Sequence, residues 1–506
     1  MPVGSGRGGK EGTEAEVKDV IQVWEETYSA TYRRMMERYP DAASMPRPIL
    51  GFHTTIDGLK RIVPEQVEAV LDADPELARE VKARVEAGDV PDEILSVADL
   101  LVGMLVSVSK GKALQRMIRN SAVHEWCLAA LGYDRLRAGG TCGNMVSMLA
   151  PLGFEQILLY VNPLTREQAE LLPPHENVKV IVAEEGADGA ASYRLTTPAK
   201  AWREEGVKAV HWIFEYPEGM RICAGGIDVR APRANRYIAA YNPVNNQLVI
   251  NRHFKAGLLE LIESGERFTH FIIAGFHILS ERYPDGSCCR DCLRPLAEFV
   301  SKVKEKAPGL KLHCELASIG GKAVRCGVME LALPISHSLG LNEVELATLL
   351  GDLEEHELRA ELERTEAPPA VFEGVAAAGE RLGLARIHLH NLGYYLCLTR
   401  SEFVDAQTTR DGLVFAACAA AARTVSGSLV SLEDVERGLD VPVSERGLKA
   451  CRELADYLGY AELVETGMAQ ARGWNVTFVP TKVVEKPVLT VGLGDLISSS
   501  SFLLGT

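Results

Sequence analysis

Hydrophobic and polar positions along this 506-residue chain follow two periodicities. Short apolar runs bounded by Gly, Pro, Asn or Asp predict buried strands, and longer segments with apolar residues every three or four positions predict amphipathic helices. The expected strands are 49–57, 156–161, 178–183, 208–214, 237–240, 271–277, 311–316 and, with a turn, 385–398. The expected helices include 15–38, 145–152, a charged one over 352–366 and an Ala-rich helical region over 411–471. This alternation predicts a parallel sheet with helices on both faces.

Near the end of the chain, one of these transitions carries candidate chemistry. An apolar run over 487–491 predicts a strand that enters Gly492-Leu493-Gly494-Asp495, and a small-residue segment with helical potential follows. Glycines let the backbone approach a ligand closely, and the free N–H groups at a helix start suit phosphate. A carboxylate there would repel phosphate unless it accepts a proton from an attacking hydroxyl. The alternative is an ordinary strand-to-helix turn in which Asp495 is the N-cap.

Two further stretches place polar groups where the expected strands end. Asp57 follows the apolar run that begins at Ile49, and open α/β sheets place ligand groups at such strand ends. Gly139 and Gly140 precede an apolar helix and predict a second close backbone contact with a polar ligand. An ordinary turn aspartate is the alternative for Asp57.

A third group of polar residues lies on an expected strand and at an expected helix start. His313 and Glu315 share one face of an expected strand, because side chains alternate with period two. Asn342 and Glu345 lie three positions apart on one helical face, where an amide and a carboxylate can orient water around Mg²⁺. The alternative for Asn342 and Glu345 is a capping box at a helix start.

Arginines and cysteines form two further clusters. Arg230, Arg233 and Arg236 fall within seven residues and suit bidentate phosphate contacts, although a surface turn paired with carboxylates is an equal alternative. The cysteines at 288, 289 and 292 include a CxxC pattern, which lacks the second pair of a zinc ribbon and is interpreted as incidental. His388 and His390 share a strand face, and packed histidines are favoured over a metal site because no third ligand is in register.

The composition limits the kinds of partner that this protein can bind. The net charge of −15 gives no general attraction to nucleic acid or to an anionic membrane, so a phosphate ligand needs a local site. No apolar run approaches the roughly 20 residues that span a bilayer, and residues 1–12 lack the apolar core of a signal peptide. Eleven cysteines without framework spacing fit a reducing cytosol, so a cytoplasmic protein is expected.

Taken together, these stretches resemble the ADP-dependent sugar kinases, the glucokinase and phosphofructokinase family found largely in archaea. The family's GxGD motif matches Gly492–Asp495, its NxxE motif matches Asn342–Glu345, and its HxE motif matches His313–Glu315. Its glycine-containing helix start matches Gly139–Gly143. The resemblance extends from about residue 47 to the C-terminus.

The resemblance implies a ribokinase-like fold. A three-layer α/β/α large domain would comprise residues 15–57, 122–184 and 241–506, and a smaller α/β lid would comprise 58–121 and 185–240. Residues 1–14, which are rich in glycine, are expected to form a flexible tail.

The resemblance also implies the chemistry. Asp495 would be the base that takes the proton from a sugar hydroxyl as that oxygen attacks the β-phosphorus of ADP, releasing AMP. The backbone amides of Gly492, Leu493 and Gly494 would form the anion hole for the transferred phosphoryl group. A lid that closes over the site would exclude water, which would otherwise accept the phosphoryl group.

Further roles follow from the same resemblance. Glu315 and Glu345 would position Mg²⁺ largely through water, with Asn342 in support. Arg233 or Arg236 would neutralise a nucleotide or substrate phosphate. The sugar hydroxyls would be held by Asp57 with Gly139 and Gly140.

The sugar end departs from the family pattern. The family's Asn-x-Asn-x-Asp loop is replaced here by His53, Thr55 and the retained aspartate, and Gln115 or Leu114 stands where glucokinases place a glutamate. A phosphorylated substrate therefore fits better, with Lys112 and the arginine cluster available for its phosphate. Fructose 6-phosphate is the default. An ADP-dependent glucokinase, a pentose-phosphate kinase, an ATP-using ribokinase-like kinase and a non-catalytic sugar or nucleotide sensor remain alternatives, with no expectation for the oligomeric state.

Overall fold

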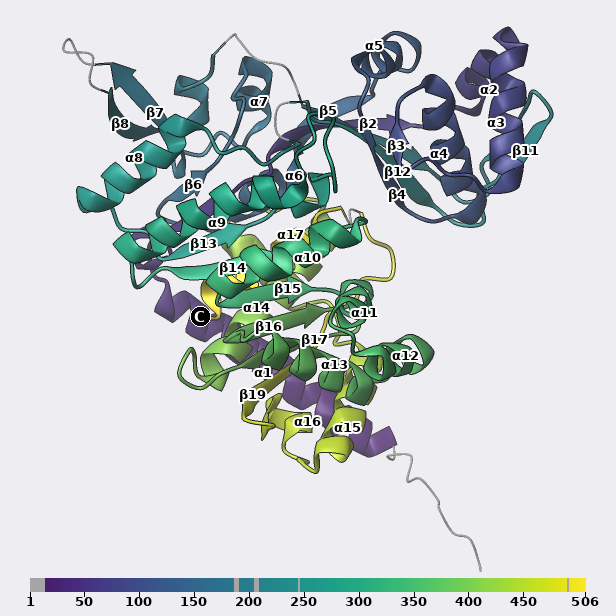
Figure 1. The fold of residues 1–506 in the computed structure, drawn as a ribbon. Helices are drawn as coiled ribbons and strands as arrows, with labels where there is room; N and C mark the ends of the chain where they lie inside the picture. The colour runs from purple at the N-terminus through teal and green to yellow at the C-terminus, as the bar shows by residue number, and fades with distance from the viewer. Residues whose placement is uncertain (1–13, 186–190, 204–208, 244–245, 489–490) are drawn as a thin grey trace, which may run out of the picture.

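The computed structural model describes residues 14–185, 191–203, 209–243, 246–488 and 491–506 (Figure 1). Within these residues the strands form an eleven-stranded sheet, a six-stranded sheet and a two-stranded hairpin. The expected tail lies outside the described residues except for Glu14, where the first helix begins. Among the described residues, no helix is both long and apolar enough to cross a membrane.

The large sheet is parallel at its centre and antiparallel at both edges. In spatial order its strands are β18 (Met468–Ala471), β19 (Trp474–Pro480), β17 (Tyr394–Thr399), β16 (Arg386–His390), β15 (Ser338–Leu341), β14 (Lys311–Glu315), β13 (His270–Ile273), β1 (Pro48–Gly51), β6 (Ile157–Leu159), β7 (Val178–Glu185) and β8 (Ala191–Thr196). The strands from β16 to β7 run parallel. Their carboxyl ends therefore meet along one edge, where open α/β sheets bind ligands.

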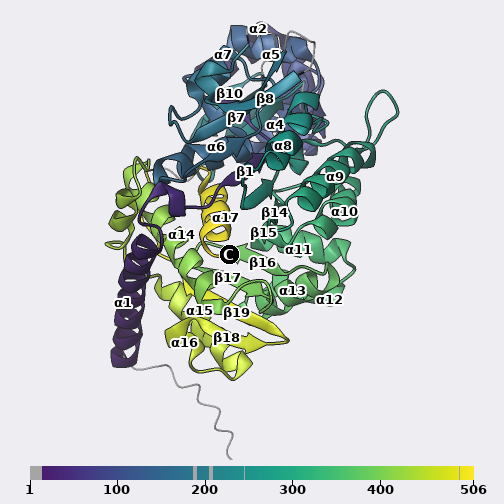
Figure 2. The same ribbon diagram turned by 90° about the vertical axis from the view of Figure 1, so that its left-hand side faces the viewer.

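Helices cover both faces of this sheet, which makes three layers (Figure 2). One face carries α8 (Arg252–Glu263), α9 (Cys289–Lys306), α10 (Lys322–Leu331), α11 (Glu343–Asp352), α13 (Pro368–Arg381) and α15 (Glu445–Leu458). The other carries α1 (Glu14–Arg38), α6 (Gly140–Leu149), α14 (Ala406–Ser426) and α17 (Leu493–Leu504). The period-two alternation of β13 serves both layers, because Phe271 packs into one core and Ile272 into the other.

The second sheet forms a smaller lobe beside the large one (Figure 1). Its strands, in order, are β3 (Glu93–Ile94), β4 (Leu114–Ile118), β12 (Asn235–Tyr241), β9 (Val210–Tyr216), β2 (Thr55–Arg61) and β5 (Arg135–Gly139). The lobe also holds α2 (Pro64–Ala73), α3 (Pro75–Ala87), α4 (Val97–Lys110), α5 (Ser121–Ala130), β10 (Arg221–Ala224) and β11 (Ile227–Arg230). A third core, separate from the two of the large sheet, fills it. The remaining helices are α7 (Arg166–Leu171), α12 (His356–Thr365) and α16 (Leu463–Thr466).

Sheet membership moves the expected domain boundaries. The apolar run 49–57 is two strands, β1 in the large sheet and β2 in the small one, so the chain crosses between sheets within it. Helix α5 and strand β5 belong with the small lobe, whereas β8 pairs with β7 in the large sheet. Sequence pattern missed the crossing because His53 and Thr54, the polar residues between β1 and β2, are buried like the strands themselves.

Two local expectations also change. The expected strand over 487–491 is not formed by residues 487, 488 and 491, and residues 489 and 490 lie outside the described part. Residues 468–471, expected to be helical, form the edge strand β18. Residues 338–341 are strand β15, and helix α11, which carries Glu345, begins at Glu343.

Candidate active site

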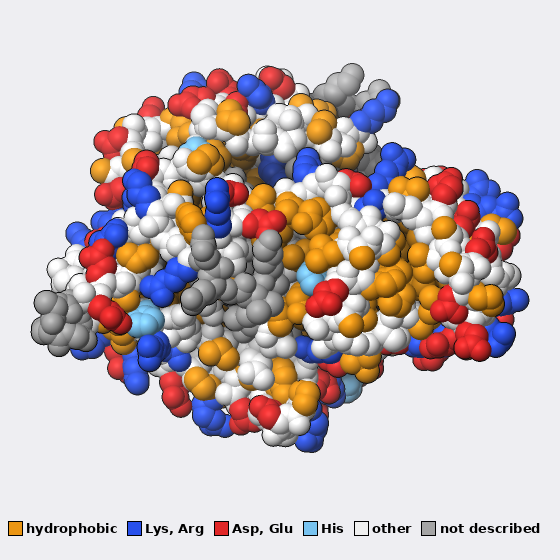
Figure 3. Space-filling view, turned by 90° about the horizontal axis from the view of Figure 1, so that it is seen from above, with side chains coloured by type: hydrophobic (Ala, Val, Ile, Leu, Met, Phe, Trp, Pro, Cys, Tyr) orange, Lys and Arg blue, Asp and Glu red, His pale blue; other side chains and the backbone are white. Residues whose placement is uncertain are grey.

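A cavity of about 310 Å³ lies between the two sheets, at the carboxyl edge of the large one. Large-sheet elements contribute Glu315, Glu345 and Asp495 to its lining, and the small sheet contributes Asp57 and Arg236. Acidic and basic side chains are interspersed over the face of the molecule in Figure 3, as far as the described residues are drawn. The cavity itself therefore supplies the local site that an acidic protein needs for a phosphate ligand.

The catalytic candidate sits in the first turn of α17. Gly492 is the N-cap, with a φ of 76° that favours glycine, and Asp495 is the third helical residue. The alternative of Asp495 as N-cap is therefore wrong. Gly492 and Gly494 line the cavity, while Leu493 is not among its lining residues. The first N–H groups of a helix have no intrahelical acceptors, so this end of α17 suits an anion.

The surroundings of Asp495 change its acidity. Asn144 Nδ2 donates a hydrogen bond to Asp495 Oδ2 at 2.8 Å. Burial, and then the negative charge of Glu315, nevertheless raise the pKa of Asp495 to about 8. A carboxyl group with a pKa near neutral pH is matched to general base catalysis.

Two further carboxylates, Glu315 and Glu345, line the same cavity as Asp495. Glu315, at the end of β14, is 5% exposed and accepts hydrogen bonds from His313 Nε2 at 3.1 Å and from Ser498 Oγ. Burial favours its neutral form, but these hydrogen bonds outweigh burial and lower the pKa of Glu315. Burial, together with the charge of Glu315, raises the pKa of Glu345 to about 7.

Asn342 caps helix α11. Its Oδ1 accepts hydrogen bonds from the backbone N–H groups of Val344 and Glu345, both at 3.0 Å, and Glu345 Oε2 accepts one from Asn342 N at 3.0 Å. The capping box considered for these residues is thus present, and the same residues also line the cavity. The amide oxygen is engaged by these two backbone donors, so the NH₂ donor is the remaining polar group of the Asn342 side chain, and a donor suits phosphate better than a metal ion.

Direct metal ligation has no obvious donor set. Among the described residues, no group of three or more His, Cys, Asp or Glu side chains is arranged to hold a metal ion. The mutual repulsion of Glu315 and Glu345 is nevertheless the kind that a nearby cation relieves. Their arrangement fits a Mg²⁺ ion that keeps several waters, because Mg²⁺ dehydrates reluctantly.

The substrate candidate Asp57 lies on β2 opposite Arg137 of β5. Arg137 Nη2 donates to Asp57 Oδ2 at 2.8 Å, and burial raises the pKa of Asp57 despite that attraction. Gly139 is not among the lining residues; a Cβ there would overlap Asp57 Oδ1, so this glycine makes room for the aspartate. Gly140, with a φ of 75°, does line the cavity.

Three histidines complete the substrate side. The ring centroid of His53 lies 4.6 Å from that of His277 and 5.2 Å from that of His211. Burial lowers the pKa of all three, to about 3 for His211 and about 4 for His277, so the cluster is neutral. His53 Nδ1 accepts a hydrogen bond from Thr141 N at 3.2 Å, which puts the ring proton on Nε2.

The other expected substrate residues divide into two groups. Arg236 and Gln115 line the cavity. Arg233, Lys112 and Thr55 are not among the lining residues, and Arg233 Nε donates instead to the carbonyl oxygen of Gly111 at 2.7 Å.

Sequence reasoning missed several residues of this site. They are Arg137, Asn144, His211, His277 and Ser498. A signal existed for Asn144, because it follows Gly140 by one helical turn and so shares its face. The others depend on pairing between elements far apart in the chain.

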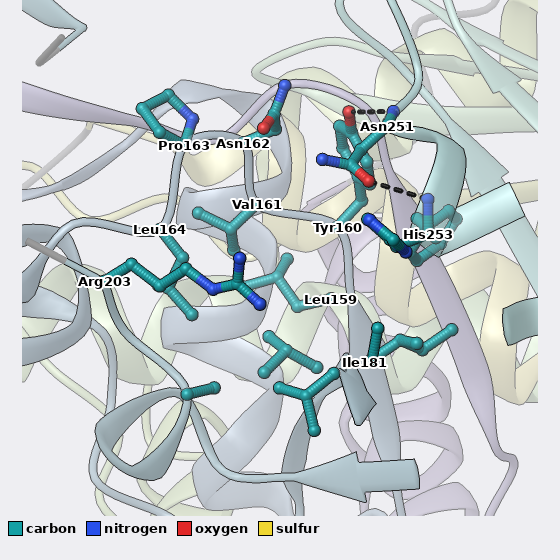
Figure 4. A pocket seen from close by; sticks show the side chains of 15 residues that line it. Leu159, Tyr160, Val161, Asn162, Pro163, Leu164, Ile181, Arg203, Asn251 and His253 are labelled. Carbon is teal, nitrogen blue, oxygen red and sulfur yellow. Dashed lines mark hydrogen bonds between the residues drawn. The ribbon is translucent and has the colours of Figure 1, made fainter. Parts of the chain in front are cut away.

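A second cavity, of about 200 Å³, lies between β6, β7 and the start of α8 (Figure 4). The polar groups on one side of it bond to each other: Tyr160 Oη accepts from Asn251 N at 2.9 Å, and Asn251 Oδ1 accepts from His253 N at 2.8 Å. It shares no lining residue with the cavity at Asp495. The contact between Asn251 and His253 N caps α8.

Comparison with known proteins identifies the family. Residues 46–504 match the family model described as the ADP-specific phosphofructokinase/glucokinase conserved region. The chain is 29% identical over 492 residues to the ADP-specific phosphofructokinase of Methanosarcina acetivorans, covering 96% of this chain and 97% of that one. It is 31% identical over 482 residues to the ADP-dependent glucose/glucosamine kinase of Pyrococcus abyssi, covering 95% and 98%.

Comparison with solved structures points to the same family. The last common ancestor of ADP-dependent phosphofructokinases from Methanosarcinales superposes with a TM-score of 0.81 at 31% identity, covering 96% of this chain and 98% of that one. An ADP-dependent kinase in complex with fructose 6-phosphate and ADPβS gives a TM-score of 0.80 at 30% identity, covering 95% and 97%. The chain is therefore a phosphotransferase with an alcohol group as acceptor. It belongs to the ADP-specific phosphofructokinase/glucokinase family, which confirms the resemblance and the α/β fold expected from the sequence.

Proposed function

We propose that this protein transfers the β-phosphoryl group of ADP to a hydroxyl of a sugar phosphate, with fructose 6-phosphate as the first candidate, and releases AMP. The observation that carries the proposal is Asp495, whose pKa of about 8 suits a base, at a helix start that faces a substrate pocket. Membership of an ADP-specific kinase family supports the choice of donor.

Asp495 accepts the proton of the attacking hydroxyl in this scheme. The backbone N–H groups of residues 492–494, at the start of α17, hold the transferred phosphoryl group as its charge spreads over the equatorial oxygens. Asn144 keeps the Asp495 carboxylate oriented through its hydrogen bond to Oδ2. The NH₂ group of Asn342 donates to a nucleotide phosphate oxygen.

Glu315 and Glu345 would hold Mg²⁺ through water, for the electrostatic reason given above. When bound, the ion neutralises charge on the phosphate oxygens. The two carboxylates would hold the hydrated ion, and Ser318 holds Glu345 through a hydrogen bond from its Oγ at 3.3 Å.

A sugar phosphate is favoured over glucose by the small-sheet side of the cavity. Arg236 lines it and makes no ion pair within 4 Å with a described residue, so its guanidinium is free for a phosphate. Gln115 supplies an amide where a glutamate would repel that phosphate. Asp57, His53 and Gly140 contact the sugar hydroxyls. Glucose, a pentose phosphate and ATP as donor remain the comparators.

The test measures AMP and phosphorylated sugar from ADP, Mg²⁺ and each of fructose 6-phosphate, ribose 1-phosphate and glucose, with ATP as a second donor. We expect AMP with ADP and fructose 6-phosphate. Product with ATP alone would contradict the donor, and a preference for glucose or ribose 1-phosphate would replace the acceptor. If the protein binds these ligands but forms no product from any donor and acceptor combination, the alternative of a non-catalytic sensor would be favoured.

Arg236→Gln tests the acceptor side separately. It should raise the KM for the sugar phosphate by roughly tenfold or more, because a charge-assisted hydrogen bond is lost, while the KM for ADP changes little. Arg221→Gln, in an exposed ion pair with Asp228 on the hairpin, is the matched control. Equal effects of the two substitutions would remove Arg236 from the phosphate site.

A further inference from the structure

A buried arginine in the centre of the large sheet has no role in the chemistry above. Arg386 on β16 is 0% exposed. Among the described residues, no carboxylate lies within 4 Å of its guanidinium. A buried charge is costly unless it is paired or fully hydrogen-bonded, so its persistence here needs an explanation.

Strand register places Arg386 at the end of a row that leads to the active site. His313 on β14 pairs with Ser338 on β15, and Ser338 pairs with Arg386. These three side chains therefore stand side by side on one face of the sheet. Glu315 begins the next row toward the cavity, two residues further along β14.

Hydrogen bonds along this row run in one direction. Arg386 Nη1 can only donate, and it lies 2.9 Å from Ser338 Oγ. Ser338 is then free to donate to His313 Nδ1 at 2.8 Å, which leaves the ring proton on Nε2. His313 Nε2 lies 3.1 Å from Glu315 Oε2 and 3.0 Å from Ser498 Oγ. The chain of donors thus ends on the Glu315 carboxylate.

A second arm of Arg386 reaches the helix that carries Asp495. Arg386 Nη2 donates to Ser501 Oγ at 3.2 Å, and Ser501 Oγ lies 3.2 Å from His388 Nδ1. On α17, Asp495, Ser498 and Ser501 follow each other at intervals of three residues and so share one face. Ser498 Oγ donates to Glu315 Oε2, which ties the same helix to β14.

The space between helix and sheet is shaped for this contact. Gly340 lies between Glu315 and His388 in the row nearer the cavity. A Cβ at position 340 would come within 2.6 Å of Glu315 Oε2 and would also meet Ser498 Oγ. The missing side chain lets α17 sit close enough for Ser498 to reach Glu315.

We propose that Arg386 is a positioning residue for phosphoryl transfer: it orients the Glu315 carboxylate through Ser338 and His313, and it holds α17, with Asp495, against the same strands through Ser501. The inference rests on the proposed function in so far as Glu315 and Asp495 act on the transferred group. In this proposal, the buried charge of Arg386 keeps the Glu315 carboxylate and the Asp495 carboxylate at a fixed separation. A purely structural arginine would stabilise the core without affecting that spacing.

Ser338→Ala tests the arm to Glu315 and Ser501→Ala tests the arm to α17. Ser336→Ala is the matched control, because Ser336 is also buried and its Oγ donates to a backbone carbonyl, that of Ala332, at 2.9 Å outside the network. We expect both network variants to lower kcat by about 10- to 100-fold, the range for a lost hydrogen bond to a charged group, with the KM for the sugar phosphate changed far less. The control should keep its kcat even if its Tm falls equally.

A binding measurement separates orientation of Glu315 from turnover. Isothermal titration gives the affinity for ADPβS with Mg²⁺ and with EDTA, and the ratio of the two reports the metal contribution. Ser338→Ala should reduce this ratio by about tenfold, whereas Ser336→Ala should leave it unchanged. Arg386→Lys keeps the charge but cannot span both serines, so it should behave like the two network variants.

Wild-type kcat and wild-type metal dependence in Ser338→Ala and Ser501→Ala would overturn the proposal. So would losses in both variants that match those of Ser336→Ala. If Arg386→Lys does not fold, the results for Ser338→Ala and Ser501→Ala determine whether the proposal holds. Failure of the proposed function has a different signature, the absence of turnover in the unmodified protein, and the titration still tests the link to Glu315 in that case.

Discussion

Three carboxyl groups that line the same cavity have different pKa values. Burial raises the pKa of Asp495 to about 8 and that of Glu345 to about 7, whereas hydrogen bonds from His313 and Ser498 overcome burial and lower the pKa of Glu315. Groups whose environments push their pKa values apart mark the division of acid-base roles. Asp495 is thus the group suited to exchange a proton near neutral pH, and Glu315 the group suited to stay ionised.

Asp495→Asn should lower kcat by about 10²- to 10⁴-fold, the range for loss of a general base. The amide keeps the shape of the carboxyl group, so the affinity for ADPβS should stay within a few-fold of wild type. Steady-state kinetics and isothermal titration check the two expectations. Retained turnover would show that another group accepts the proton.

The same variant should change the pH dependence of stability. The folded-state pKa of Asp495, about 8, lies above the ordinary value of 3.8, so its contribution to stability is complete below about pH 4 and is lost as the pH rises toward 8. Without nucleotide or metal, the free-energy advantage of Asp495→Asn over wild type should therefore grow between pH 5 and pH 8. Each pH unit in this range corresponds to about 1.4 kcal/mol, so a gain on the order of 3–4 kcal/mol is expected between these two pH values. Thermal unfolding at both pH values measures it, and a constant difference would contradict the burial of this charge.

His53 should donate a hydrogen bond from its Nε2–H to a sugar hydroxyl, because this group has no partner among the described residues. His53→Asn keeps an acceptor near Nδ1 for Thr141 N but removes that donor, whereas His53→Gln places a donor near it. The KM for the sugar phosphate should rise by about tenfold in the first variant and less in the second. His356→Asn, at the exposed start of α12, is the control. Equal effects of Asn and Gln, or an effect on ADP alone, would argue against this contact.

At the scale of elements, α17 is the helix that joins the proposed catalytic groups. Its first turn carries Asp495, its second and third turns carry Ser498 and Ser501, and its other contacts are with α14 and α6. Helix α14 is buried almost all round, because α17 covers one side of it and α1 another. This packing explains why an Ala-rich stretch with no clear polar face is still a stable helix.

Gly492→Ala should distinguish an effect on catalysis at the start of α17 from a general loss of stability. A φ of 76° is strained for alanine, by about 1–2 kcal/mol, and the strain would shift the N–H groups that hold the phosphoryl group. Gly459→Ala is the matched control, since Gly459 has a φ of 72° at the end of α15 and no atom lies within 4 Å of the position that a Cβ would take there. Both variants should lose similar Tm, and only Gly492→Ala should lose kcat. Equal kinetics in the two would remove the helix start from catalysis.

For the whole molecule, the site exists only between two sheets. Asp57, Arg236 and His211 come from the small sheet, whereas Glu315 and the start of α17 come from the large one. A ligand that contacts both sides gains most when the lobes approach, and closure of this kind excludes water from phosphoryl transfer.

Small-angle X-ray scattering should therefore record a smaller radius of gyration when fructose 6-phosphate and ADPβS are both present. Either ligand alone should cause a smaller decrease, because each fills one side of the cavity. Arg236→Gln should need a higher sugar phosphate concentration for the same decrease. An unchanged radius at saturating ligand would mean that the lobes are already as close as transfer requires.

Much of this architecture could be predicted from local pattern. The alternation of apolar runs and amphipathic segments predicts a parallel sheet between helical layers, and the motifs around Asp495, Glu315 and Glu345 indicate parts of one site. The capping box of Asn342 and Glu345 is also visible in the sequence, because capping depends on residues three positions apart. Such features depend on neighbours in the sequence, so the sequence is sufficient for them.

Tertiary structure alone decided the rest. The crossing from β1 to β2 runs through the buried polar residues His53 and Thr54, so its place depends on which sheet each strand joins. The Arg137–Asp57 ion pair and the row from Arg386 to Glu315 come from register between strands distant in the chain. The three neutral histidines meet because the segment after β1, strand β9 and the short helix after β13 lie together. The raised pKa of Asp495 likewise results from burial among those elements. Sequence determined which groups could do chemistry, and packing determined their charge and their partners, because solvation and hydrogen bonding depend on three-dimensional neighbours.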